Sequence, residues 1–270
     1  SDILIIPWAM ERNVRFETGV GPLLDAMQQP DEIDATCLDG LSQKLAPVGE
    51  ALILTRAALP AETTLIGFAG APWTLITYMS EGGTSRDFSK ARKWAWQNRK
   101  ILDGLIDILV DATISFLSLQ AQSGAQTLML FDSWANAVPA SQRDWLVIKP
   151  TRAIIEGVRK NGHNQPIIGF PRGIGEGLVR YAAESGVDAI SLDQGVDPVW
   201  AGQNLPSKMP VQGNVDPLGL LNAIVEMFRD IDHILEAFHN RPHIFNLGHG
   251  ITPPTPVENV QKMIDYIRYR

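Results

Sequence analysis

The sequence has little of what several common protein classes require. It contains a single cysteine, Cys37, among 270 residues, so no internal disulfide can form and a disulfide-stabilised secreted fold is excluded. Lys and Arg number 23 against 30 for Asp and Glu, which gives a formal net charge of −7. Because binding to a phosphate backbone needs a surplus of positive charge, no nucleic-acid partner is expected.

Long apolar runs are also missing. No apolar stretch of the sequence approaches the ~20 residues that a membrane-spanning helix needs, so no membrane partner is expected. One cysteine and five scattered histidines show no C-x-x-C or H-E-x-x-H spacing, so no zinc or other metal site is predicted. Together these absences lead us to expect a cytoplasmic protein.

What the sequence does contain is enough apolar material for one large core. Apolar residues make up 45% of the chain, and neither a linker rich in Pro and Ser nor an internal repeat divides it. Residues 1–270 are therefore predicted to form a single domain.

Seven short apolar runs, each closed by Gly, Pro or Asp, are typical of buried parallel strands. They are Ile3–Ile6, Thr64–Phe68, Thr127–Phe131, Ile167–Phe170, Ala189–Leu192, Pro210–Gln212 and His243–Leu247. Helical patterns lie between them, such as the apolar face from Leu102 to Leu117. Capping patterns at Asp216 with Pro217, and at Thr255 with Glu258, mark the starts of two later helices.

Strands that alternate with helices predict a parallel sheet, either open and doubly wound or closed into a barrel. A (β/α)8 TIM barrel needs eight strands, whereas seven are found and the first begins almost at Ser1. We therefore favour a TIM barrel that lacks its N-terminal strand. An open doubly wound sheet remains the alternative.

In such a barrel the active site forms at the carboxyl ends of the strands, so polar residues after each run are the candidates. His249 lies between two glycines, where it can donate a hydrogen bond to a substrate carboxylate or carbonyl. Tyr78 follows the run GFAGAPWTL and either contacts a bound acid or packs in the core. Ser133 has no base nearby in the sequence, so a hydrogen-bond donor is favoured over a nucleophile.

Three further groups have structural interpretations. Arg172 can face an anionic ligand or pair with Asp193 or Asp197, and we favour the pairing. The aspartates at 193, 197 and 216 precede or begin helices, which predicts N-capping. Four other histidines, at positions 163, 233, 239 and 243, fall in polar helix ends or loops and are interpreted as solvated.

Several long segments resemble the uroporphyrinogen decarboxylase family, in that family's order, from Ser1 almost to Arg270. They are IGFAGAPWTLITY (66–78), MLFDSWA (129–135), IIGFPRGIG (167–175), AISLDQGVDPVWA (189–201), VQGNVDPLGLL (211–221), IFNLGHG (244–250) and TPVENV (255–260). The resemblance implies a single-domain TIM barrel that forms a homodimer and uses neither a metal nor an organic cofactor. It implies decarboxylation of the four acetate side chains of uroporphyrinogen III to give coproporphyrinogen III.

The resemblance also implies roles for four residues. Asp2 matches the family's essential aspartate, Tyr78 its pocket tyrosine, Ser133 a substrate-binding hydroxyl position and His249 its pocket histidine. Asp2 and Tyr78 would be catalytic, and all four would bind substrate. Loss of carbon dioxide from a pyrrole acetate needs prior protonation of the ring, and a carboxylate such as Asp2 can stabilise the resulting positive charge.

The sequence also departs from the family. The chain begins after the position of the family's Arg-rich segment, so we expect both that segment and the first strand to be missing. Trp8 and Glu11 replace the Asp and Gly of the family's PDAMG. The corrinoid-dependent methyltransferases, which bind zinc through His and Cys, are the main alternative. A barrel without activity that acts as a binding protein is a second.

Overall fold

A computed structural model describes residues 2–17, 21–222 and 224–269. The main sheet has six parallel strands: β3 (Ile66–Gly70), β4 (Thr127–Asp132), β5 (Ile167–Pro171), β6 (Ala189–Ser191), β7 (Val211–Gln212) and β8 (His243–Ile244). The strands pair in strict chain order. A doubly wound sheet reverses its order at a switch point, so this order favours a barrel wall over the open alternative.

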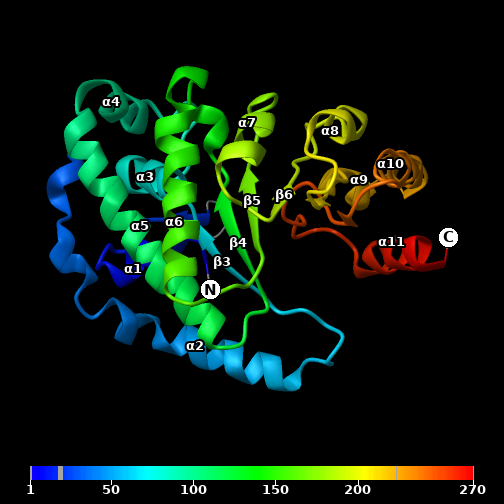
Figure 1. The fold of residues 1–270 in the computed structure, drawn as a ribbon, viewed down its shortest axis with the longest axis horizontal. Helices are drawn as coiled ribbons and strands as arrows, with labels where there is room; N and C mark the ends of the chain where they lie inside the picture. The colour runs from blue at the N-terminus through cyan, green and yellow to red at the C-terminus, as the bar shows by residue number, and fades with distance from the viewer. Residues whose placement is uncertain (1, 18–20, 223, 270) are drawn as a thin grey trace.

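Helices connect successive strands and cover the outer face of the sheet (Figure 1). They are α2 (Leu41–Ala58), α3 (Pro72–Glu81), α4 (Ser89–Gln97), α5 (Arg99–Gln122), α6 (Lys149–Lys160), α7 (Gly177–Glu184), α8 (Pro198–Asn204), α9 (Pro217–Asn222), α10 (Ile224–Ala237) and α11 (Val257–Tyr269). Short helical turns precede α2 and follow β4: η1 (Pro30–Glu32), η2 (Ala35–Leu38), η3 (Ala135–Ala137), η4 (Ala140–Gln142) and the π-helical η5 (Asp144–Ile148). In the described part of the chain, no helix is long and apolar enough to cross a bilayer.

Buried side chains form two clusters on the two faces of the sheet. The larger cluster runs from Leu4 to Met263 and packs the helices against the outer face. The smaller cluster contains Met129, Ile168, Phe170 and Ala189, with Phe68 and Phe131 packed against it. Its members recur at every second residue of neighbouring strands, as expected for side chains that point to one face. This inner face leads to the carboxyl ends of the strands.

The predicted strand at Ile3–Ile6 is wrong, because this segment begins the helix α1 (Ile5–Ala9). The Asp2 carboxylate accepts a hydrogen bond from the Leu4 amide at 2.8 Å, and the Asp2 carbonyl accepts one from the Ile5 amide at 3.1 Å. These bonds start a turn at the point where a strand would need extended backbone. A four-residue apolar run does not distinguish a strand from a buried helical turn.

The sequence interpretation also missed a small hairpin. β1 (Arg15–Glu17) and β2 (Gly21–Leu23) pair antiparallel, separately from the main sheet. The strands are only three residues long and none of their side chains is buried, so they lack the apolar run that identifies a core strand.

Candidate active site

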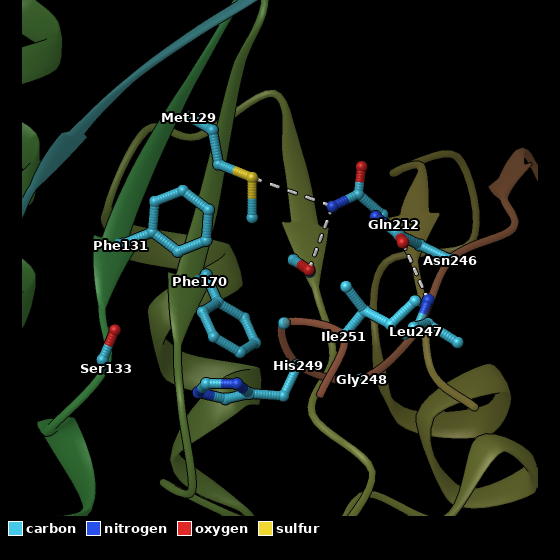
Figure 2. A pocket seen from close by; sticks show the side chains of 12 residues that line it. Met129, Phe131, Ser133, Phe170, Gln212, Asn246, Leu247, Gly248, His249 and Ile251 are labelled. Carbon is cyan, nitrogen blue, oxygen red and sulfur yellow. Dashed lines mark hydrogen bonds between the residues drawn. The ribbon is translucent and has the colours of Figure 1, made fainter. Parts of the chain in front are cut away.

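The candidate site lies where the inner face of the sheet ends. A cavity of about 420 Å³ is lined by Met129 and Phe131, successive inner residues of β4, and by Ser133 directly after that strand. Phe170 lines it from β5, and the segment Asn246–Ile251 lines it from the loop after β8. Figure 2 shows the His249 ring against Phe170, with Ser133 on the β4 side. The lining mixes apolar side chains with polar ones, which include Ser191 and Gln212, as in many small-molecule sites.

The structure places Ser133 and His249, both predicted to bind substrate, on the same cavity. The His249 and Phe170 ring centroids are 6.2 Å apart. Burial lowers the pKa of the His249 imidazole, the positive charge of Arg172 lowers it further, and Asp193 opposes both effects. Because the ordinary histidine pKa is about 6.5, the lowered value keeps His249 neutral at pH 7, when one ring nitrogen donates and the other accepts.

The loop that carries His249 is held by a close backbone approach. A Cβ atom added at Gly248 would lie 2.3 Å from the Gln194 amide nitrogen and 2.9 Å from the Asp193 carbonyl carbon. The Gly248 amide donates to the Val215 carbonyl at 2.7 Å. Only glycine allows the loops after β6 and β8 to pack at this distance.

Asp2 and Tyr78 form a second pair, away from this cavity. Asp2 lines an apolar hollow of about 500 Å³ with Trp8, Val14 and Phe16. Tyr78 lies on α3 and is 7% exposed. Burial raises the pKa of its phenol, the Trp134 indole acts in the opposite direction, and the negative charge of Asp2 raises it again. That last effect shows that the Asp2 carboxylate lies within electrostatic range of the phenol.

Trp134 joins the two pairs. It follows Ser133 in the chain, and its ring centroid lies 6.4 Å from that of Tyr78 and 4.8 Å from that of Phe88. Its backbone is held on both sides by α3: the Trp73 indole donates to the Trp134 carbonyl at 3.0 Å, and the Trp134 amide donates to the Thr74 hydroxyl at 3.2 Å. The sequence interpretation did not assign Trp134 this connecting position.

The Thr74 hydroxyl donates in turn to Asp132, at 2.7 Å. Asp132 is 2% exposed, and its second carboxyl oxygen has no hydrogen-bond partner in the described part of the chain. Burial raises the pKa of this carboxyl to about 7, although its hydrogen bond with Thr74 lowers it. A half-neutral carboxyl therefore directly precedes Ser133 in the chain, on the side of β4 that faces α3.

The expected pairing of Arg172 is wrong. Asp193 accepts hydrogen bonds from the amides of Gly173 at 2.7 Å and Gly195 at 2.8 Å, so it clamps two loops. Asp197 caps α8. Neither aspartate forms an ion pair with Arg172 in the described residues; backbone amides satisfy both carboxylates instead. N-capping is confirmed for Asp197 and for Asp216, which accepts from the Leu218 amide at 2.9 Å, but not for Asp193.

His243 is not solvated as expected. It lies on β8, half-buried between Phe238 and Phe245, and its Nε2 donates to the Gly213 carbonyl at 2.6 Å. Burial lowers the pKa of its imidazole, the carbonyl contact opposes this, and the charge of Arg241 lowers it further. His243 therefore stabilises the β7–β8 pairing as a neutral donor.

Metal ligands do not gather anywhere in the described ranges. Within residues 2–17, 21–222 and 224–269, no group of three or more His, Cys, Asp or Glu side chains could hold an ion. Cys37 lines a separate hollow with Lys44 and Asp34, away from the cavity of His249. This donor set does not fit the zinc site of the methyltransferase alternative.

Comparison with known proteins gives consistent matches over the chain. The family model described as uroporphyrinogen decarboxylase (URO-D) matches residues 1–269. A uroporphyrinogen decarboxylase from Maricaulis maris is 46% identical over 270 residues, which cover 100% of this chain and 78% of that protein. One from Novosphingobium aromaticivorans is 43% identical, with 99% and 78% covered.

Solved structures show a shared fold at low sequence identity. A methyltransferase from Methanosarcina mazei superposes with a TM-score of 0.82 at 18% identity, over 99% of this chain and 78% of that one. A B12-independent methionine synthase from Shewanella sp. W3-18-1 gives a TM-score of 0.55 at 12% identity, over 95% and 72%. At these identities the likeness concerns the fold alone.

Proposed function

The chain belongs to the uroporphyrinogen decarboxylase family and is a carboxy-lyase of porphyrin and heme biosynthesis, and we propose that it converts uroporphyrinogen III to coproporphyrinogen III. The observation that supports the proposal is a chain of neighbours: Ser133 and His249 line one cavity, the Trp134 ring after Ser133 lies 6.4 Å from that of Tyr78, and the charge of Asp2 acts on the Tyr78 phenol. A cytoplasmic location and a homodimer belong to the same proposal.

The reaction needs an electron sink. Protonation of the ring carbon next to the one that bears an acetate arm makes the pyrrole cationic. The bond between the arm's methylene and its carboxylate then breaks, its electron pair forms a double bond from the methylene to the ring, and carbon dioxide leaves. Protonation of the methylene and loss of the first proton from the ring carbon give the methyl group of the product. A carboxylate close to the ring stabilises the cation as it develops. We assign this role to Asp2, which forms no ion pair in the described part of the chain and is therefore free to face a cation.

The other three residues would bind and orient the substrate. The neutral His249 ring and the Ser133 hydroxyl can donate hydrogen bonds to acid side chains in the cavity that they share. Tyr78 stays protonated because its pKa is raised, so its phenol can donate to a substrate carboxylate or to Asp2. None of these steps requires a metal or an organic cofactor.

The test is Asp2→Asn in the whole protein, assayed for coproporphyrinogen formation. The Asn side chain keeps an oxygen that can accept from the Leu4 amide, so α1 should form normally. Turnover should fall by about 100-fold or more, the usual loss when one transition-state contact to a developing charge is removed. Unchanged turnover would refute the assignment of Asp2.

Asp34→Asn is the matched control. Asp34 makes the same contact, from its carboxylate to the Thr36 amide at 2.8 Å, but it is exposed and lines a different hollow. Its turnover should stay at the wild-type level. Treatment with a metal chelator should leave the turnover of each variant unchanged. Zinc bound in a one-to-one ratio, with activity lost on its removal, would instead favour a methyltransferase-like enzyme.

A further inference from the structure

Arg172 lies in the turn that directly follows the carboxyl end of β5. Phe170, two residues earlier on β5, lines the cavity. The Arg172 amide donates to the carbonyls of Asp132 and Phe170, each at 3.1 Å, so its backbone stays tied to the ends of β4 and β5. Its guanidinium lies by the ring of Trp134, the residue that directly follows the cavity-lining Ser133.

The guanidinium of Arg172 forms no ion pair or hydrogen bond with any side chain or carbonyl in residues 2–17, 21–222 and 224–269. The nearby carboxylates do not pair with this positive charge. Asp193 accepts hydrogen bonds from backbone amides, and Asp197 accepts them from the first amides of α8. Other arginines around the same end of the sheet are paired, such as Arg143 with Glu176 at 3.3 Å and Arg180 with Asp144 at 3.1 Å.

The side chain is nevertheless held in place. The Arg172 Cζ lies 5.6 Å from the centre of the Trp134 ring, and Trp134 is fixed by its bonds to Trp73 and Thr74. A guanidinium above an aromatic face keeps its N–H donors free at its edge. The charge of Arg172 also acts on the His249 imidazole, so the free donors lie close to a predicted substrate-binding residue.

We infer that Arg172 binds a carboxylate arm of the substrate and helps to set specificity for a highly anionic tetrapyrrole. The inference rests on the proposed function, since that function supplies the carboxylates. A planar guanidinium takes a carboxylate through two parallel N–H···O bonds. The chain has a net charge of −7, so a polyanion needs local positive charge of this kind at the cavity.

The test compares Arg172→Gln and Arg172→Lys with the wild type in uroporphyrinogen turnover. Arg172→Gln should raise KM about ten-fold or more, the loss expected for one charge-assisted contact, and should change kcat little. Arg172→Lys keeps the positive charge but lacks the planar pair of N–H donors. Its KM should therefore lie between those of the wild type and Arg172→Gln. The pKa of His249, followed by NMR, should rise in Arg172→Gln because a neighbouring positive charge has been removed.

Arg180→Gln is the control for a lost positive charge outside the cavity, because Arg180 is paired with Asp144 and Glu184. It should leave KM unchanged. The melting temperature of each variant separates misfolding from lost binding. If Arg172→Gln melts at a lower temperature than the wild type, the KM of Arg172→Lys is used for the comparison instead. A KM unchanged in both Arg172 variants, or a loss confined to kcat, would overturn the inference.

Failure of the proposed function has a different result: the wild type would not turn over uroporphyrinogen at all. In that case fluorescence titration with uroporphyrin and coproporphyrin decides the role of Arg172. Weaker binding of uroporphyrin by Arg172→Gln, with a smaller change for coproporphyrin, supports carboxylate recognition. Equal binding by wild type and variant refutes it.

Discussion

The contribution of Asp132 to the free energy of unfolding should depend strongly on pH. Burial raises the pKa of this carboxyl from an ordinary 3.8 to about 7 in the folded protein. Between those two values the folded chain holds a proton that the unfolded chain has released. The contribution of Asp132 to stability is therefore greatest below pH 3.8 and is lost as the pH rises to about 7.

Asp132→Asn should remove this dependence on pH. The free energy of unfolding of the variant relative to the wild type should then increase with pH, by roughly 1.4 kcal/mol per unit between about pH 5 and pH 7. Urea unfolding at the two pH values measures the difference. A variant-minus-wild-type difference that is the same at both values would show that Asp132 is ionised throughout.

At the scale of single elements, the position of the loop after β8 depends on Gly248. Gly248→Ala should push the backbone away from Gln194, since its Cβ would lie 2.3 Å from that amide nitrogen. The shift moves His249 in the cavity, and a displacement of about 1 Å can cost about 100-fold in rate. We therefore expect lower stability and a large loss of turnover.

Gly250→Ala is the matched substitution in the same loop. A Cβ at Gly250 meets no atom within 4 Å, so its effect on the free energy of unfolding should stay within about 0.5 kcal/mol. Chemical denaturation of both variants gives the comparison. Equal destabilisation would mean that the close approach at Gly248 does not hold the loop.

Helix α3 shows how one element can position several parts of a site. Every residue from Pro72 to Ser80 is buried, so the helix is fixed on all sides. It carries Tyr78, and through Trp73 and Thr74 it holds Trp134 beside the cavity. The fold therefore places the phenol and the indole as one rigid unit.

At the scale of the whole molecule, we propose that the protein is one domain and forms a homodimer. The larger core cluster reaches from Leu4 to Met263, so chain segments far apart in sequence share one interior. Exposed apolar side chains on an outer helix, such as Ile53 and Leu54 on α2, are of the kind that a two-fold contact covers.

Light scattering at micromolar concentration should give twice the mass of the chain. Because dissociation accompanies unfolding of a dimer, the melting temperature should also rise with protein concentration. A monomer mass together with a melting temperature that does not depend on concentration would contradict the dimer. Two separate transitions in calorimetry would contradict the single domain.

The sequence by itself determined the parallel α/β barrel class, six of the seven predicted strands and the family. Period-two and helical patterns report which face of an element is apolar, and long matching segments such as IGFAGAPWTLITY (66–78) are specific. The tertiary structure alone decided that Ile5–Ala9 is a helix, that Arg172 is unpaired, that His243 is half-buried and that Asp132 holds a proton near neutral pH. These properties depend on which groups meet across strands and loops, and on how much water reaches them, and neither is written in the spacing of residues along the chain.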